Sequence, residues 1–180
     1  EFGMTMDLEN RNAITWDDDR KAAAFVTAKD PTVLKFAKNV AGMVKDYPGA
    51  KLNTNLLTAA GVHQALKLYG MSYVIDPTTP YKELSKKDLA VDFLQFPNQT
   101  LAFKAGDCDD LSILYCALLE AVGIETAFVT IPAHIYMVLS LDIPPEKARE
   151  QFPNTEDLIF YDDKTWLPIE VTSLDTGFYE

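Results

Sequence analysis

The stretch AGDCDDLSILYCALLEAVGIETAFVTIPAHIYMVL, residues 105–139, joins a helix pattern to two strand patterns and sets a cysteine among three aspartates where the helix begins. Residues 108–123 have helical apolar spacing, and Asp107 precedes them as the expected N-cap. Asp109 and Asp110 suit the positive end of the helix dipole. The expected buried stripe consists of Leu111, Tyr115, Leu118 and Val122. Cys108 lies one turn before this stripe and continues it, so we expect the thiol to face the body of the protein.

Strand patterns dominate the rest of the chain. Residues 124–131 and 134–142 read as consecutive strands, and residues 158–172 as a hairpin with its turn near 162–164. A short surface helix is expected within 144–157, beginning at its prolines. Helices followed by antiparallel strands predict an α+β fold.

The first half of the chain reads as helical, and its expected helices span residues 15–28, 30–47 and 53–71. Thr15 with Asp18 resembles a capping box, and Asp30 with Pro31 forms a second helix start. Gly70 is expected to end the third helix. Residues 91–105 read as an irregular segment.

The expected organisation is an N-terminal helical extension over residues 1–52 and a core over 53–180. Residues 1–3 read as a cloning remnant, and we expect the chain to be excised from a longer protein.

Composition excludes several classes of function. The net charge of −11 argues against nucleic acid as a partner, and no apolar run reaches the ~20 residues of a membrane helix. The two cysteines, Cys108 and Cys116, lie roughly 12 Å apart along one helix, too far for a disulfide. Cys116 is expected to be a buried apolar residue, and the lack of paired Cys and His argues against zinc.

The alternation of side chains between the two faces of a strand points to two further candidate residues. One face of the 134–142 strand is apolar: Ile135, Met137, Leu139 and Leu141. His134 lies on its other face, together with Tyr136, Val138 and Ser140. In the last strand Leu167, Ile169 and Val171 form the apolar side, which leaves Trp166, Pro168, Glu170 and Thr172 opposite. If the two strands are neighbours, His134 and Glu170 point to the same side, toward the amino end of the Cys108 helix.

Such a grouping suits cysteine chemistry. An imidazolium beside the thiol stabilises the thiolate, and a carboxylate on the other ring nitrogen fixes the tautomer. The aspartates oppose thiolate formation, but we expect Asp109 and Asp110 to point to solvent, where their charges are screened.

The same residues resemble a known family. GDCDD at a helix start, a small residue–Gly–Ile turn into a strand, a His-aromatic strand and the W-x-P-x-E-x-T strand are similar to the core of bacterial transglutaminase-like cysteine hydrolases, over roughly residues 55–175. The resemblance implies a papain-like fold and acyl transfer from an amide of a protein or peptide through a thioester, to water or to an amine. It implies that Cys108 is the nucleophile, His134 the base and acid, and Glu170 the orienting acid, where the family usually has aspartate. Asp162 and Asp163 are competitors for the third role, although both lie in a turn.

The oxyanion would need the Cys108 backbone N–H and a side-chain donor. Gln95 is the favoured donor among the upstream amides Gln95, Asn98 and Gln99. Tyr136 and Trp166 either wall the cleft or cover the sheet.

Several alternatives stay open. A catalytically silent domain that binds a peptide or supports an assembly competes with the enzyme, and a redox thiol is a weaker third possibility. No cofactor is expected, except that some relatives use an acidic pair after the cysteine to bind calcium, which makes Asp109 and Asp110 candidate ligands. His63 is expected to pack at a helix rim, and residues 17–19 to be a solvated helix start. The resemblance favours a bacterial periplasm or cell envelope over the cytoplasm.

Overall fold

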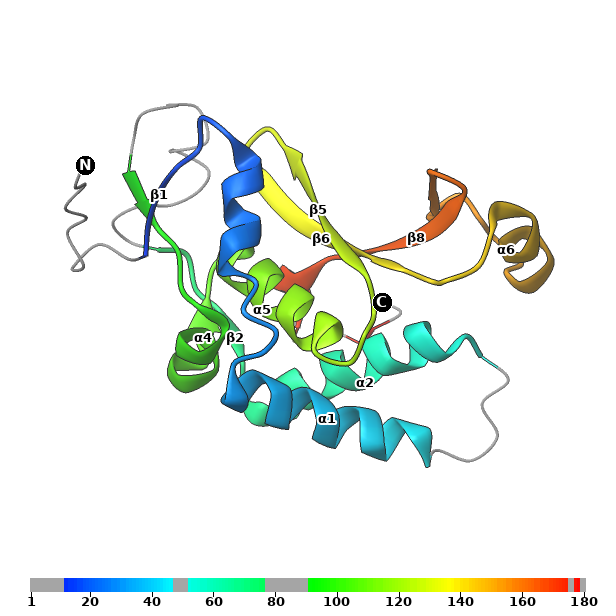
Figure 1. The fold of residues 1–180 in the computed structure, drawn as a ribbon, viewed down its shortest axis with the longest axis horizontal. Coiled ribbons are helices and arrows are strands. Elements are labelled where there is room, and N and C mark those ends of the chain that lie inside the picture. Colours follow the sequence, from blue (N-terminus) through cyan, green and yellow to red (C-terminus); the bar gives the residue numbers. More distant parts are fainter. Residues whose placement is uncertain (1–11, 47–51, 77–90, 175–176, 179–180) are drawn as a thin grey trace, which may run out of the picture.

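The computed structural model describes residues 12–46, 52–76, 91–174 and 177–178 (Figure 1). Its helices are the 3-10 helix η2 (Asp19–Phe25), α1 (Pro31–Lys45), α2 (Thr54–Tyr69), α4 (Pro97–Phe103), α5 (Cys108–Glu120), α6 (Pro145–Gln151) and the 3-10 helix η3 (Val171–Ser173). Its strands are β1 (Ala13–Thr15), β2 (Ser72–Tyr73), β3 (Val91–Phe93), β4 (Ala105–Gly106), β5 (Thr126–Ile131), β6 (His134–Ser140), β7 (Ile159–Tyr161) and β8 (Lys164–Ile169). This mixture of helices with a largely antiparallel sheet confirms the α+β prediction.

The main sheet has four strands in the order β5-β6-β8-β7, all antiparallel. The register pairs Met137 with Ile169 and Leu139 with Leu167, so the predicted apolar faces of β6 and β8 coincide. Two small sheets flank it: β1 pairs antiparallel with β3, and β2 pairs parallel with β4.

Helix α5 runs through the middle of the molecule, between the main sheet and the pair α1 and α2 (Figure 1). Every residue from Cys108 to Leu119 is buried, including those outside the predicted apolar stripe. A helix that is enclosed on all sides has no solvent face, and this decides the surroundings of Cys108.

The N-terminal segment differs from its prediction, since no α-helix spans 15–28. Residues 13–15 form β1, because Ile14 and Trp16 alternate with more exposed neighbours and bury their side chains at strand spacing. Asp18, not Thr15, caps η2 by accepting from the Arg20 backbone N–H.

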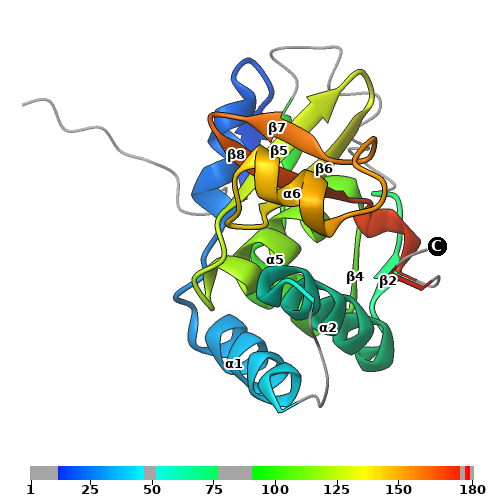
Figure 2. The ribbon, with the colours of Figure 1, turned by 90° about the vertical axis from the view of Figure 1, so that its right-hand side faces the viewer.

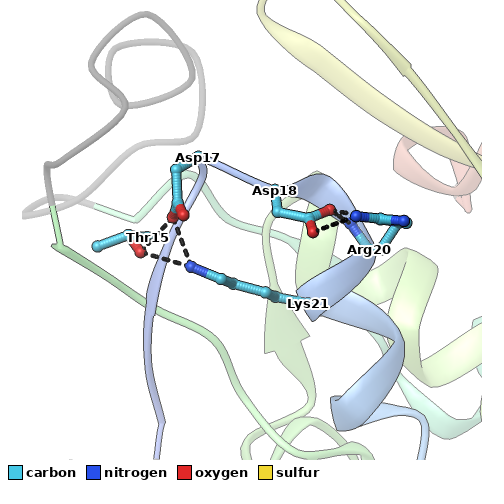
Figure 3. A network of polar contacts seen from close by, with 5 residues as sticks. All are labelled: Thr15, Asp17, Asp18, Arg20 and Lys21. Carbon is cyan, nitrogen blue, oxygen red and sulfur yellow. Dashed lines mark hydrogen bonds and ion pairs between the residues drawn. The ribbon is translucent and has the colours of Figure 1, made fainter.

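The charges of residues 17–21 pair with one another at the surface. Asp17 contacts Lys21 and Thr15, while Asp18 holds the Arg20 guanidinium at 2.7–2.8 Å (Figure 3). The predicted solvated acidic turn is therefore exposed, and two of its three aspartates are paired with its own basic residues.

The next two helices confirm their predicted boundaries. Asp30 caps α1 with Pro31 in the first turn, and Asn53 caps α2. Gly70, in the left-handed region at φ +85°, ends α2. The helix α4 was missed within 91–105, although Pro97 at its first position is a start signal.

The N-terminal residues share the core of the rest of the chain. β1 lies on β3, Trp16 donates to Asp92 at 2.7 Å, and Phe25 stacks on Phe96 with ring centroids 4.9 Å apart. The boundary at residue 52 stays a prediction, but residues 12–46 are packed onto the core.

The C-terminal half follows its predictions closely. The predicted helix within 144–157 appears as α6. The predicted hairpin has a two-residue turn of Asp162 and Asp163, and both residues have the positive φ that a type I′ turn requires. Within the described ranges, no helix is both long and apolar enough to cross a bilayer.

The turn between β5 and β6 sets the position of His134. Ile131 pairs with His134, which leaves a two-residue loop of Pro132 and Ala133. Ala133 has φ +67°, a left-handed conformation that glycine adopts without strain. This tight turn fixes the register of β6 and places the imidazole at its first position.

The substitution Ala133→Gly is expected to stabilise the protein by about 0.5–1 kcal/mol. The left-handed backbone costs a residue with a Cβ roughly 1–2 kcal/mol, partly offset by the greater freedom of glycine in the unfolded chain. Urea denaturation of the two proteins measures the difference, and an unchanged or lower midpoint would contradict the strain.

Candidate functional site

Cys108 is the first residue of α5 and is buried, with 5% of its surface exposed. The thiol receives a hydrogen bond from the backbone N–H of Ile135 in β6. Around it lies a small apolar cluster made of Ile14, Trp16, Ala22, Phe25, Leu94, Ile113 and Ile135. The thiol is therefore held between the start of α5 and the start of β6.

Gly106 is required by the close approach of β4 to the first turn of α5. A Cβ added there would lie 2.6 Å from the Asp110 Cβ and 3.3 Å from the Thr100 Cγ2. The glycine of the GDC motif thus has a packing role that brings β4 against the acidic turn.

His134 and Glu170 form a hydrogen-bonded pair, with 2.8 Å between His134 Nε2 and Glu170 Oε2. The other carboxylate oxygen accepts from the Thr172 backbone N–H at 3.0 Å and from its hydroxyl at 2.7 Å. Burial opposes ionisation of Glu170, but the hydrogen bonds from Thr172 and His134 outweigh it and lower the pKa of this carboxyl. The longer glutamate thus reaches the imidazole from the end of β8, and Asp162 and Asp163 lie at the opposite end of that strand.

The Cys108 thiol lies beside the residue that follows His134 in β6. Ile135, whose N–H contacts the Cys108 sulfur, directly follows His134 in β6. His134 and Glu170 therefore contact each other, and the residue after His134 lies beside Cys108. The thiol is buried, whereas the side chains of His134 and Glu170 are 29% and 48% exposed.

Asp109 and Asp110 do not point to solvent as predicted. Both are buried, at 3% and 5% exposure, because α5 is enclosed on all sides. Asp109 accepts from the Asp110 backbone N–H, and Asp110 from the Gln95 backbone N–H, both at 2.7 Å. Burial raises the pKa of Asp109 well above its ordinary value and that of Asp110 to about 7.

The surroundings of Cys108 favour a neutral thiol. Burial, and next the charge of Asp107, raise the pKa of Cys108 to about 12, against weaker support from the backbone N–H groups. The predicted screening of the acidic neighbours is absent, because they lie inside the protein with the thiol.

Asp107, Asp109 and Asp110 form a cluster of oxygen donors that suits a hard cation. One carboxylate oxygen from each lies within 4.8 Å of the others, and all three residues are buried. Asp107 caps α5 in position only: its side chain makes no capping bond, and its Oδ1 is buried without a hydrogen-bond partner. Carboxylate oxygens alone match the preference of calcium, so the donor set fits that ion.

Two of the three upstream amides are engaged elsewhere. The Gln95 side-chain oxygen is buried without a hydrogen-bond partner, and its backbone supports Asp110. Asn98 donates to Asp30 at 3.0 Å, while Gln99 accepts from Asn12 and from the Phe96 backbone. The side chains of Asn98 and Gln99 therefore have structural partners, while Gln95 lies at the first turn of α5 and stays a candidate donor.

The two aromatic candidates, Tyr136 and Trp166, lie at different distances from His134. Tyr136 stacks with His134, with centroids 6.1 Å apart, and so lies beside the pair. Trp166 pairs with Ser140, which lies six residues from His134 along β6, so Trp166 is roughly 20 Å from His134. Its side chain is buried, and its indole N–H donates to the Tyr161 carbonyl. Trp166 covers the sheet and is not part of the site.

Tyr73 lies beside the start of α5 but was missed by sequence reasoning. Burial raises the pKa of Tyr73, and the acidic groups of Cys108, Asp107, Asp109 and Glu170 raise it further. The parallel pairing of Tyr73 with Gly106 brings it there. No local pattern predicts a pairing between residues so far apart in sequence.

A cavity of about 260 Å³ adjoins Glu170 and is also lined by His63, Pro168 and Phe178. His63 is buried rather than at a helix rim and packs edge-on against Phe178. A larger cavity, about 540 Å³, lies between η2, α5 and β5, and its lining does not include Cys108, His134 or Glu170. The smaller cavity is thus lined by Glu170, but neither of the two cavities is lined by Cys108 or His134.

Cys116 lies within α5 as a buried free cysteine, as predicted, and Cys108 is likewise unbridged. A redox pair between them has no support in this geometry.

Comparison with known proteins gives one finding. No curated protein and no solved structure matches the chain. A family model described as the transglutaminase-like superfamily matches residues 60–170, a segment that includes Tyr73, Cys108, His134 and Glu170. The chain therefore belongs to the transglutaminase-like superfamily.

Proposed function

We propose that this domain is a cysteine-dependent hydrolase that cleaves an amide bond of a protein or peptide through a thioester. The observation that carries the proposal is the His134–Glu170 pair at 2.8 Å beside a thiol that contacts Ile135, the residue after that histidine. A nucleophile next to a base that is itself oriented by a carboxylate is the arrangement that covalent acyl transfer needs.

The reaction proceeds in two balanced steps. The Cys108 sulfur attacks the amide carbonyl carbon while the thiol proton passes to His134. Collapse of the tetrahedral intermediate breaks the C–N bond, and His134 returns the proton to the leaving amine. Water then attacks the thioester with His134 as base, which releases the carboxylic acid and the free thiol.

The surroundings favour general-base catalysis over a preformed ion pair. With a thiol pKa of about 12, Cys108 is neutral at rest, so its proton leaves only as the sulfur attacks. Glu170, kept ionised by Thr172 and His134, then stabilises the imidazolium that forms.

The oxyanion needs two donors near the thiol. The Cys108 backbone N–H is one, because α5 begins at this residue and its first N–H groups have no partner within the helix. Tyr73 is proposed as the side-chain donor in addition to Gln95, because Tyr73 pairs with Gly106, two residues before Cys108, and a phenol O–H can donate.

A catalytically silent domain that binds a peptide is the second candidate. It is favoured by the burial of Cys108 and by the raised pKa of its thiol. A library of peptide amides, with Cys108→Ser as control, separates the two: cleavage that requires Cys108 supports the enzyme.

Alkylation of Cys108 by iodoacetamide is expected to depend on His134. In a Cys116→Ala background that leaves one thiol, His134→Ala should slow alkylation at pH 8 by at least about tenfold, since the base is lost. The wild-type rate should still be rising between pH 7 and 9, because the thiol pKa is about 12. Mass spectrometry of the Cys108 peptide follows the reaction.

Glu170→Gln is the matched variant for this experiment, since it keeps the size of the side chain but removes its charge. It should give an intermediate rate. Equal rates in all three proteins would show that the pair does not act on the thiol.

Tyr73→Phe is expected to lower kcat for peptide-amide cleavage by about 100-fold, because it removes one oxyanion donor. Alkylation by iodoacetamide forms no oxyanion and should be unchanged. Both rates are measured on the same preparation, and an unchanged kcat would exclude this role of the phenol.

A regulatory calcium ion is a further expectation that the acidic cluster supports. Asp107, Asp109 and Asp110 would hold it, and it would supply positive charge against three buried carboxylates next to Cys108.

Millimolar calcium is expected to raise the Tm of the wild type by about 5 °C, since a ligand that binds only the folded state stabilises it. Asp109→Asn should lose most of this rise, and magnesium, which prefers a more regular site, should act less. Differential scanning calorimetry with and without calcium measures the shift in each protein, and a wild-type Tm that calcium leaves unchanged would contradict the site.

A further inference from the structure

The strand β2 offers one free edge next to the candidate site. Its other edge is paired: the Ser72 N–H donates to Lys104 O at 3.0 Å and the Val74 N–H to Gly106 O at 2.9 Å. Backbone groups alternate in direction along an extended chain, so those of Tyr73 and Ile75 point away from β4. In the part of the chain that the structure describes, no strand pairs with this second edge.

The edge is exposed and apolar. Tyr73, Val74 and Ile75 are 41%, 51% and 60% exposed, and β2 lies beside β4 at one side of the molecule (Figure 2). An exposed edge of this kind is a template for an added strand, unless charges or proline blunt it. Ser72, Tyr73, Val74 and Ile75 include neither, and the sequence continues with Asp76 and Pro77, which limit the available edge to these four residues.

The edge is continuous with the thiol. Tyr73 contributes its outward backbone groups to the edge and its phenol to the surroundings of Cys108 and Glu170. Ile75, two residues on, shares the face of Tyr73 if the chain stays extended. A chain paired with this edge would therefore pass beside the reacting sulfur.

We propose that the substrate binds as an extended peptide that adds a strand to the free edge of β2. This rests on the proposed function and specifies its substrate class: an unfolded segment with apolar side chains beside Tyr73 and Ile75 and without carboxylates. Acidic side chains are disfavoured because the carboxyl groups of Asp107 and Glu170 already act on Tyr73, which pairs with Gly106 next to Asp107. Main-chain hydrogen bonds give such a complex its affinity, and the alternate side chains give it specificity.

Ile75→Pro tests the edge, because it removes one outward N–H and leaves the Val74 N–H, which pairs with β4, in place. Ile75→Thr is the matched control that keeps the N–H and suits a strand. The probe is a fluorescein-labelled ten-residue peptide of alternating valine and lysine, and its binding is followed by anisotropy in the Cys108→Ala background. A second peptide carries N-methyl groups on alternate amides.

The expected result is that Ile75→Pro and N-methylation each weaken binding about tenfold, while Ile75→Thr changes it less than about threefold. Equal binding of the two peptides, no loss in Ile75→Pro, or no binding of either peptide to the unsubstituted edge would overturn the proposal. Circular dichroism of Ile75→Pro shows whether the fold is retained, and the N-methylated peptide tests the pairing without any change to the protein.

Alkylation of Cys108 by iodoacetamide separates this proposal from the proposed function. The small reagent has no strand to add, so Ile75→Pro should be alkylated as fast as the wild type. Loss of His134-dependent alkylation would contradict the catalytic proposal, whereas loss of peptide binding with normal alkylation would contradict only the edge.

Discussion

The enclosure of α5 is the constraint on which the rest of the structure depends. The sheet lies on one side of this helix and α1 and α2 on the other, so its first turn is buried as completely as its middle. A buried first turn brings four polar side chains inside at once: a thiol and three carboxylates. Removing several like charges from water is costly unless protons, hydrogen bonds or a cation compensate, and the first two are found here. The N–H groups of Gln95 and Asp110 supply hydrogen bonds, and the raised pKa values of Asp109 and Asp110 show that protons supply part of the rest.

The same enclosure explains why the thiol and the imidazole differ in exposure. The backbone of β6 enters the core directly after His134, where Ile135 is fully buried against the cluster around Cys108. His134 itself stays at the strand start, held by the tight turn at Pro132 and Ala133, with Glu170 beside it. The proposed nucleophile is thus buried at the start of α5, while its proposed base at the start of β6 is partly exposed to solvent.

Sequence patterns predict what is local or periodic in this protein. The caps at Asp30 and Asn53 and the αL glycine at Gly70 mark helix ends by their own chemistry, and strand parity correctly placed His134 and Glu170 on one side. The failures at the candidate site share one cause, which is that burial from a distant element cannot be read from local spacing. Asp109 and Asp110 look like a solvated helix start until the packing around α5 is known. Tyr73 enters the site only through the pairing of β2 with β4.

The exposed members of the site show from which side a substrate must approach. Cys108 is covered on its core side by the cluster that includes Trp16, Phe25 and Ile113, so the sulfur can be reached only past groups that remain open. Those groups are His134, Glu170 and Tyr73, which come from β6, the end of β8 and β2. Tyr73 differs from the other two because it pairs with Gly106, two residues before Cys108, and its backbone also has an edge that no described strand covers. A chain bound there would be aligned by main-chain groups, which every polypeptide has, and selected by the acidic surroundings, which exclude carboxylates. The acidity that opposes ionisation of the thiol would then also act as a filter on the substrate, so one feature of the first turn of α5 affects both the reaction and its specificity.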